Sequence, residues 1–171
     1  GKTLRLAIAT CEDLWEDEYN TKPSQFYRGS ADLLVDLSHS PWTAQKWRAR
    51  DRMLHKRATE VGCPILYVNA VGLQNNSKNL VWFDGDSSLV DPLGAVVWSA
   101  PLHREALSVV NPAHAMSHPQ TITHLDGIAE KHAAIIPAMP AFYTPFKRVI
   151  VGLSGGIDSA VSLALHVEAL G

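Results

Sequence analysis

The chain has 171 residues, of which 46% are hydrophobic and 19% are charged, and its formal net charge is −2. This length suits about one domain, and the slightly acidic balance argues against a nucleic-acid or anionic-membrane partner. No apolar run approaches the ~18 residues of a membrane-spanning helix, and we expect no signal peptide, because the first residues lead directly into a strand. Two cysteines in apolar runs, without metal-ligand spacing, favour a reducing cytoplasm.

The first predicted element is a largely buried strand over residues 4–10, which ends at Cys11. A cysteine between a buried strand and an acidic turn is placed like a nucleophile at a sharp elbow, where the next N–H can donate to an oxyanion. The same pattern also suits an inert core cysteine. A loop with a short helix, Ser24 to Arg28, is predicted to follow.

A second strand is predicted over residues 31–38, and it leads to Ser40-Pro41. Ser40 is suited to cap a helix that has Pro41 at its first position, although a ligand contact is equally compatible with this placement. The clearest helix is predicted over residues 41–61, with Gly62 as its C-cap.

One face of this helix is apolar, and we interpret its basic residues as a solvated face rather than a nucleic-acid patch. The apolar residues are Trp47, Leu54, Ala58 and Val61, and the basic residues are Arg48, Arg52, Lys56 and Arg57.

The middle of the chain is predicted to be rich in strands. A third buried strand spans residues 63–72, with Cys63 as a structural residue, and a polar loop follows from Gln74 to Asn79. Residues 80–98 predict three short strands, joined by turns at Asp84-Gly85 and at Pro92-Leu93-Gly94.

Residues 99–120 combine prolines and histidines with little periodicity, which indicates a linker. The histidines lack helix-face spacing beside a carboxylate, so we assign no metal site. An amphipathic helix is predicted over residues 122–134, and Pro137 and Pro140 are expected to interrupt the pattern.

The stretch from Val149 to Ser159 is predicted to form a strand, a Ser-Gly-Gly loop and the start of a helix. Backbone N–H groups at such a junction converge at the positive end of the helix dipole and favour an anion. The glycines permit positive φ and a close phosphate approach. The spacing differs from that of a Walker loop.

This stretch resembles the pyrophosphate-binding loop of ATP pyrophosphatases, in the form found in NAD synthetases. The resemblance implies ATP and Mg²⁺ as cofactors of a synthetase site. It also implies that Asp158 contacts Mg²⁺, whereas the position of Asp158 at the start of a helix suits an N-cap instead. The ATP-binding residues that it implies are Gly152, Leu153, Ser154, Gly155, Gly156, Ile157, Asp158 and Ser159.

The segment from Cys11 to Trp15 resembles the nucleophile segment of the nitrilase superfamily, as found in glutamine-hydrolysing domains. That family uses a Glu–Lys–Cys triad, and only ten residues precede Cys11 here, so we expect its Glu and Lys upstream of this chain. The resemblance implies that Ser40, Lys46 and Glu12 bind glutamine. Asp36 stands where the family's Asn-x-Ser-x-Ser-Pro segment has Asn.

The order of the two motifs is similar to that in glutamine-dependent NAD synthetases. The resemblance implies an α/β fold: the C-terminal part of a nitrilase-like α-β-β-α sandwich, followed by the start of a Rossmann-like ATP-pyrophosphatase domain. We expect the division 1–100 (glutaminase), 101–120 (linker) and 121–171 (synthetase). The chain is expected to be a piece of a longer polypeptide and inactive by itself.

The implied partners are glutamine, ATP and nicotinic acid adenine dinucleotide, in a cytoplasmic homo-oligomer without nucleic acid or membrane. Ammonia from glutamine would amidate the adenylated dinucleotide, giving NAD, AMP, pyrophosphate and glutamate. Two alternatives remain at this point. The chain is a catalytically incompetent piece that acts as an interaction module, or it is a plain carbon–nitrogen hydrolase, a reading that leaves the Ser-Gly-Gly loop unexplained.

Overall fold

The computed structural model describes residues 3–75 and 77–171. Gly1 and Lys2 lie outside the described residues, as does Asn76, which belongs to the predicted 74–79 loop. The strands are β1 (Leu6–Thr10), β2 (Leu33–Ser38), β3 (Ile65–Asn69), β4 (Val71–Asn75), β5 (Leu80–Asp84), β6 (Ser88–Val90) and β7 (Val96–Ser99). The helices are α1 (Pro23–Tyr27), α2 (Lys46–Val61), α3 (Pro112–Ser117), α4 (Gly127–Tyr143) and α5 (Ile157–Leu170), with short 3₁₀ helices η1 (Cys11–Leu14) and η2 (Glu16–Glu18).

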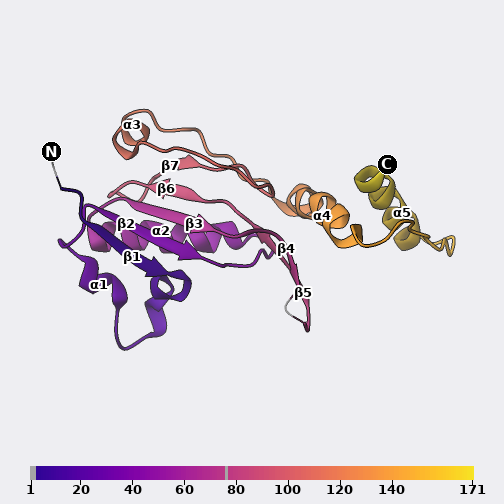
Figure 1. Cartoon of the computed structure of the whole chain (residues 1–171), viewed down its shortest axis with the longest axis horizontal. Helices are drawn as coiled ribbons and strands as arrows, with labels where there is room; N and C mark the ends of the chain where they lie inside the picture. Colours follow the sequence, from indigo (N-terminus) through magenta and orange to yellow (C-terminus); the bar gives the residue numbers. More distant parts are fainter. Residues whose placement is uncertain (1–2, 76) are drawn as a thin grey trace.

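A five-stranded sheet in the order β1-β2-β3-β6-β7 forms the body of one half of the molecule, and α4 and α5 extend away from it (Figure 1). β1, β2 and β3 are parallel, and β6 and β7 join them in antiparallel pairs. β4 and β5 form a separate hairpin that projects from the sheet (Figure 1). The predicted strand over residues 63–72 is therefore two strands in two sheets, while the three strands predicted within residues 80–98 are confirmed.

Helix α2 covers one face of the sheet and builds the main core. Leu54, Ala58 and Val61 are buried against Leu34 and Ile65 of the sheet, which confirms the predicted apolar face for these three residues; the fourth, Trp47, stacks on His124 instead. Successive strand residues point to opposite faces, which aims every second side chain of β2 and β3 at this helix. Gly62 ends α2 with a φ of 77°, as predicted for a C-cap.

The opposite face of β1 and β2 is exposed, which corrects the expectation that the first strand is largely buried. Leu6 is 55%, Ile8 52% and Leu37 51% exposed. β1 is an edge strand. A second apolar cluster, which includes Ala115 of α3, covers the β6–β7 end of this face, so the core there is local and leaves β1 open.

Helix α2 begins at Lys46, five residues later than predicted, and Ser40 is not its N-cap. The backbone of Ser40 is held instead by Asn69 at the end of β3: its N–H donates to Oδ1 (2.8 Å) and its carbonyl accepts from Nδ2 (3.1 Å). The Trp42 N–H donates to the Trp82 carbonyl in β5. These contacts keep the segment before α2 extended across the sheet edge.

Two predictions for the C-terminal part of the chain are wrong. Helix α4 starts at Gly127 rather than 122 and runs through Pro137 and Pro140. Residues 149–151 form no strand in the described part of the chain, because a strand needs a neighbour that accepts and donates its backbone hydrogen bonds. Among the described residues, no helix is long and apolar enough to cross a bilayer.

Candidate functional site

Cys11 lies where β1 turns into η1, with a backbone φ of +43°. A non-glycine residue at positive φ is uncommon and marks a sharp, constrained turn. Asp13 closes this turn, because its Oδ2 accepts from the Thr10 N–H (2.8 Å) and the Thr10 hydroxyl (3.1 Å). The elbow predicted from the sequence is therefore present, with the Cys11 side chain half-buried.

The carboxyl ends of the three parallel strands bring the polar residues of this region together. β1 leads to Cys11, β2 leads to Ser40, and β3 ends at Asn69. Ligands in open α/β sheets bind at this edge of the strands. Ser40 is buried, and its two backbone bonds with Asn69 fix it beside the sheet; the sequence reasoning did not assign Asn69 a role.

Lys46, the first residue of α2, lies on the same side of the sheet. Its Nζ donates to the Pro41 carbonyl (3.0 Å) and lies 5.9 Å from the centre of the Trp15 ring. Burial, and next the positive charge of Arg50, lower the pKa of the Lys46 ammonium. The negative charge of Asp84 is the largest effect in the opposite direction, followed by those of Cys11 and Glu12.

Glu12 follows Cys11 on the exposed side of the elbow. Its Oε1 accepts from the Tyr19 hydroxyl at 2.5 Å. This hydrogen bond is the largest cause of the raised pKa of Tyr19. Glu12 thus joins η1 to the residues after η2, and its exposed carboxylate remains accessible from solvent.

Asp36 is fully buried in β2, beside Ala9 of β1 and Tyr67 of β3. Its Oδ2 accepts from the Ser38 hydroxyl at 2.6 Å, and its Oδ1 has no hydrogen-bond partner among the described residues. Burial raises the pKa of the Asp36 carboxyl to about 6, opposed by the bond from Ser38. Burial therefore disfavours the ionised form of this carboxyl.

A buried ionic group that the sequence reasoning missed supports the site from α2. Arg50 is 1% exposed and holds Asp84 through both terminal nitrogens, at 3.0–3.1 Å, and Asp86 at 2.8 Å. Burial acts to lower the pKa of Arg50, but the two aspartates outweigh it and the net pKa is raised. The Asp-Gly-Asp turn after β5, an acidic pair between apolar strands, was the available signal.

Arg57 is buried, which corrects its assignment to a solvated face. Its Nε donates to the Leu14 carbonyl (2.8 Å) and lies 3.4 Å from Oε1 of the buried Glu16. Its other nitrogens pair with Asp17 and Glu60. Arg57, which was predicted to be exposed, thus links the segment after Cys11 to α2. A buried guanidinium requires carboxylate partners, and these residues supply them.

The predicted phosphate loop lies before α5, and its residues are exposed except for the half-buried Ser159. The Ser154 N–H donates to the Ser159 hydroxyl (3.2 Å), which in turn donates to the Gly156 carbonyl (2.9 Å). Gly155 has the predicted positive φ, +86°. The N-cap is Gly156, so the alternative role of Asp158 as N-cap is wrong; Asp158 lies in the first turn.

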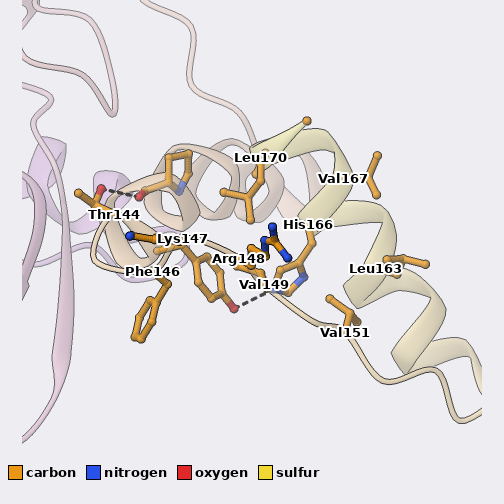
Figure 2. A pocket seen from close by; sticks show the side chains of 14 residues that line it. Thr144, Phe146, Lys147, Arg148, Val149, Val151, Leu163, His166, Val167 and Leu170 are labelled. Atoms are coloured by element: carbon orange, nitrogen blue, oxygen red, sulfur yellow. Dashed lines mark hydrogen bonds between the residues drawn. The ribbon is translucent and has the colours of Figure 1, made fainter.

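A groove of about 640 Å³ lies between α4, α5 and the segment that joins them. Tyr143 and His166 both line it, and the tyrosine hydroxyl lies 2.8 Å from His166 Nε2; Figure 2 shows His166 on α5 facing the segment that carries Arg148 and Val149. Lys147 and Arg148 also line it. Residues 152–159 do not line this groove, and α5 lies beyond α4, away from the five-stranded sheet (Figure 1). The structure therefore keeps the loop apart from Cys11, Ser40 and Lys46.

A family model described as carbon-nitrogen hydrolase matches residues 2–114, which include the elbow, the sheet and α2. The chain belongs to the carbon-nitrogen hydrolase family. A second model, described as NAD synthase, matches residues 142–171, which contain the Ser-Gly-Gly loop and α5. The two matches follow one another along the chain in the order that the motifs predicted.

Two curated relatives of this chain are glutamine-dependent NAD(+) synthetases. The protein from Synechocystis is 30% identical over 99% of this chain and 32% of its own length. The protein from Xylella fastidiosa strain 9a5c is 33% identical over 99% of this chain and 31% of its own length. The chain thus spans about a third of the length of the curated relatives it matches.

A solved structure has the same fold. The glutamine-dependent NAD+ synthetase from Acinetobacter baumannii, in complex with ADP, matches with a TM-score of 0.80 and 29% identity, covering 97% of this chain and 31% of the other. The predicted resemblance to this enzyme class and the predicted α/β fold class are confirmed.

Proposed function

We propose that this chain is the junction part of a glutamine-dependent NAD synthetase, in which a nitrilase-type glutaminase supplies ammonia to an ATP-consuming amidation. The observation that carries the proposal is the order of the two family matches within one chain, residues 2–114 and then 142–171. Within this proposal the glutaminase part ends near residue 100, residues 101–120 connect the two parts, and the synthetase part begins at 121.

In the glutaminase half, the Cys11 thiolate attacks the side-chain amide carbon of glutamine. Ammonia leaves, and water hydrolyses the thioester to glutamate. The Glu12 N–H, which follows the elbow, is placed to donate to the tetrahedral oxyanion. Ser40 and Lys46 lie at the same sheet edge and would contact glutamine together with Glu12. The base and the second oxyanion donor, a Glu and a Lys in this family, come from sequence outside these residues.

In the synthetase half, ATP adenylates the carboxylate of nicotinic acid adenine dinucleotide and releases pyrophosphate, and ammonia then displaces AMP to give NAD. The loop from Gly152 to Ser159 would hold the phosphates through backbone N–H groups and hydroxyls. Mg²⁺ commonly binds through one or two carboxylates plus substrate phosphates, where it neutralises charge. Asp158, exposed in the first turn of α5, fits that part.

A glutamine-mimicking diazoketone tests the nucleophile. The longest natural polypeptide that contains this chain and the 171-residue chain are treated in parallel, and the adduct is mapped by peptide mass spectrometry. We expect the adduct on Cys11, at least in the longer polypeptide. Cys63 is buried, and burial raises the pKa of its thiol, so it serves as the internal control. Labelling of Cys63, or of neither cysteine, contradicts the glutaminase assignment.

Replacing the nucleophile separates the two halves. In the longer polypeptide, Cys11→Ala is expected to lower glutamine-dependent NAD formation by ~10³-fold or more, because covalent catalysis is lost. Activity with free ammonia, followed by pyrophosphate release, should stay within about twofold of the unmodified enzyme. Equal loss with both nitrogen donors would argue against two sites. A plain carbon–nitrogen hydrolase would release no pyrophosphate at all.

A further inference from the structure

Helix α2 begins without an N-terminal cap from its own sequence. Gln45 occupies the N-cap position in the left-handed region, with a φ of 62°, and its side chain makes no capping hydrogen bond. The first turn of α2 also contains no acidic residue. The first N–H groups of a helix need acceptors, and the helix dipole favours a negative charge there.

Glu130, 85 positions further along the chain, supplies the missing acceptor. Its Oε1 accepts from the Gln45 N–H at 2.7 Å, and the residue is 6% exposed. Charge-assisted hydrogen bonds of this type are among the stronger ones in proteins. α4 therefore caps α2 from outside, and it does so with a buried carboxylate.

Glu130 also lines a small, mostly apolar cavity beside α2. Oε2 of Glu130 and the indole N–H of Trp47 are both buried without a hydrogen-bond partner among the described residues. The two residues line the same cavity, of about 20 Å³.

Lys46 directly follows Gln45, so the cap acts on the residue assigned to the glutamine site. The segment between Pro41 and Lys46 has no regular structure except turns. It is fixed at one end by the Trp42 N–H bond to Trp82 and at the other by Glu130. Loss of the second anchor would leave the Lys46 backbone free to shift, and displacements of about 1 Å at a binding group are costly.

We propose that Glu130 is a positioning residue for Lys46: α4 holds the start of α2, and with it the Lys46 ammonium, through the bond between the Glu130 carboxylate and the Gln45 N–H. This inference rests on the proposed role of Lys46 in glutamine binding. The inference assigns a function in the proposed glutamine site to Glu130, which lies outside the residues matched by the carbon-nitrogen hydrolase model.

The test compares Glu130→Ala and Glu130→Gln in the longest natural polypeptide that contains this chain. KM and kcat are measured with glutamine and with free ammonia. Glu130→Ala removes the acceptor and is expected to raise the glutamine KM by roughly tenfold while leaving ammonia-dependent activity unchanged. Glu130→Gln keeps an acceptor oxygen at the same reach and should stay within about threefold of the unmodified enzyme.

Asp126→Asn is the matched control, since Asp126 lies at the start of the same helix and forms an exposed ion pair with Arg48. It should leave the glutamine KM unchanged. A Glu130→Ala enzyme with an unchanged glutamine KM, or with equal losses for both nitrogen donors, overturns the inference. Lys46→Ala identifies the other failure: if it leaves the glutamine KM unchanged, the proposed site itself is wrong, and the inference falls with it.

Discussion

The elbow at Cys11 and the loop before α5 differ in what holds them. Buried groups far away in the sequence fix the first region: Arg57 binds the Leu14 carbonyl, and Asn69 binds both backbone groups of Ser40. The hydrogen bonds of the second region join residues 154–159 to one another. A junction held by distant buried charges responds to core mutations, whereas a locally bonded loop does not.

The largest expected effect that sharpens this contrast comes from Arg50→Ala. The substitution removes the buried guanidinium that pairs with Asp84 and Asp86 and leaves His124 as the remaining partner of Asp86. Removing one member of a buried pair costs about 3–5 kcal/mol. Urea unfolding followed by tryptophan fluorescence measures the loss. The control Arg148→Ala, at an exposed position beside the groove, should change the free energy of unfolding by less than ~0.5 kcal/mol. Similar values for both variants would remove the contrast.

Asp36→Asn should stabilise the protein at neutral pH. Because burial raises the pKa of Asp36 to about 6, the native state keeps a proton that the unfolded chain releases near 4. Its contribution to stability is thus full below pH 4 and is lost as the pH rises through 6, by roughly 1–3 kcal/mol.

Asparagine carries no such charge, so the fall in stability between pH 4 and 6 should flatten. Asp13 acts in the same direction as burial, while Ser38 and the Cys11 N–H oppose it, which makes Asp13→Asn a useful second variant. Urea midpoints at pH 4, 5, 6 and 7 test the prediction. A slope that is unchanged by Asp36→Asn would show that Asp36 does not titrate in this range.

His124 should titrate above its ordinary value of 6.5. Its contact with the Asp86 carboxylate, 3.4 Å from Nε2, is the largest cause of its raised pKa, against the effect of burial, and its ring stacks on that of Trp47 with the centroids 4.4 Å apart. The stabilising contact with Asp86 is present below pH 6.5 and weakens as the pH rises through the folded-state pKa. Histidine proton NMR, assigned with His124→Gln, measures the midpoint; a value at or below 6.5 would contradict the pairing.

The smallest expected effect comes from Ser159→Ala in the loop. The hydroxyl bonds Ser154 and Gly156 at a half-buried site next to exposed residues, so the free energy of unfolding should change by less than ~0.5 kcal/mol. Amide exchange at Ser154 should nevertheless become faster, because its N–H loses the Ser159 hydroxyl as acceptor. A loss of more than 2 kcal/mol would mean that this loop is held as firmly as the elbow.

The sequence predicts elements well where a periodic pattern and a partner surface agree. The buried face of α2, its end at Gly62 and the three short strands after residue 80 are examples. The strand expected at 149–151 fails because β-branched residues form a strand when a neighbouring strand pairs with them.

The pairing of charges across the fold could not be predicted. Arg57 is as polar in sequence as its exposed neighbour Lys56, and its burial depends on Glu16, which lies 41 positions earlier. Ser40 has the local sequence of a helix cap, but Asn69 binds its backbone instead. Cys11 was assigned as a nucleophile from the family resemblance, because the strand and acidic turn alone also suit an inert core cysteine; catalysis by Cys11 and ligand binding by Ser40, Lys46 and Glu12 stay predictions.

The two prolines of α4 create a place at which this helix can bend. Proline has no N–H, so Pro137 and Pro140 donate nothing to the carbonyls of Ala133 and Ile136, four residues before each of them. Helices bend most readily where such backbone hydrogen bonds are absent. The N-terminal half of α4 is fastened to α2 at Glu130, while its C-terminal half leads to the Ser-Gly-Gly loop. Whatever angle α5 takes can therefore be absorbed within α4, without loosening the cap on α2.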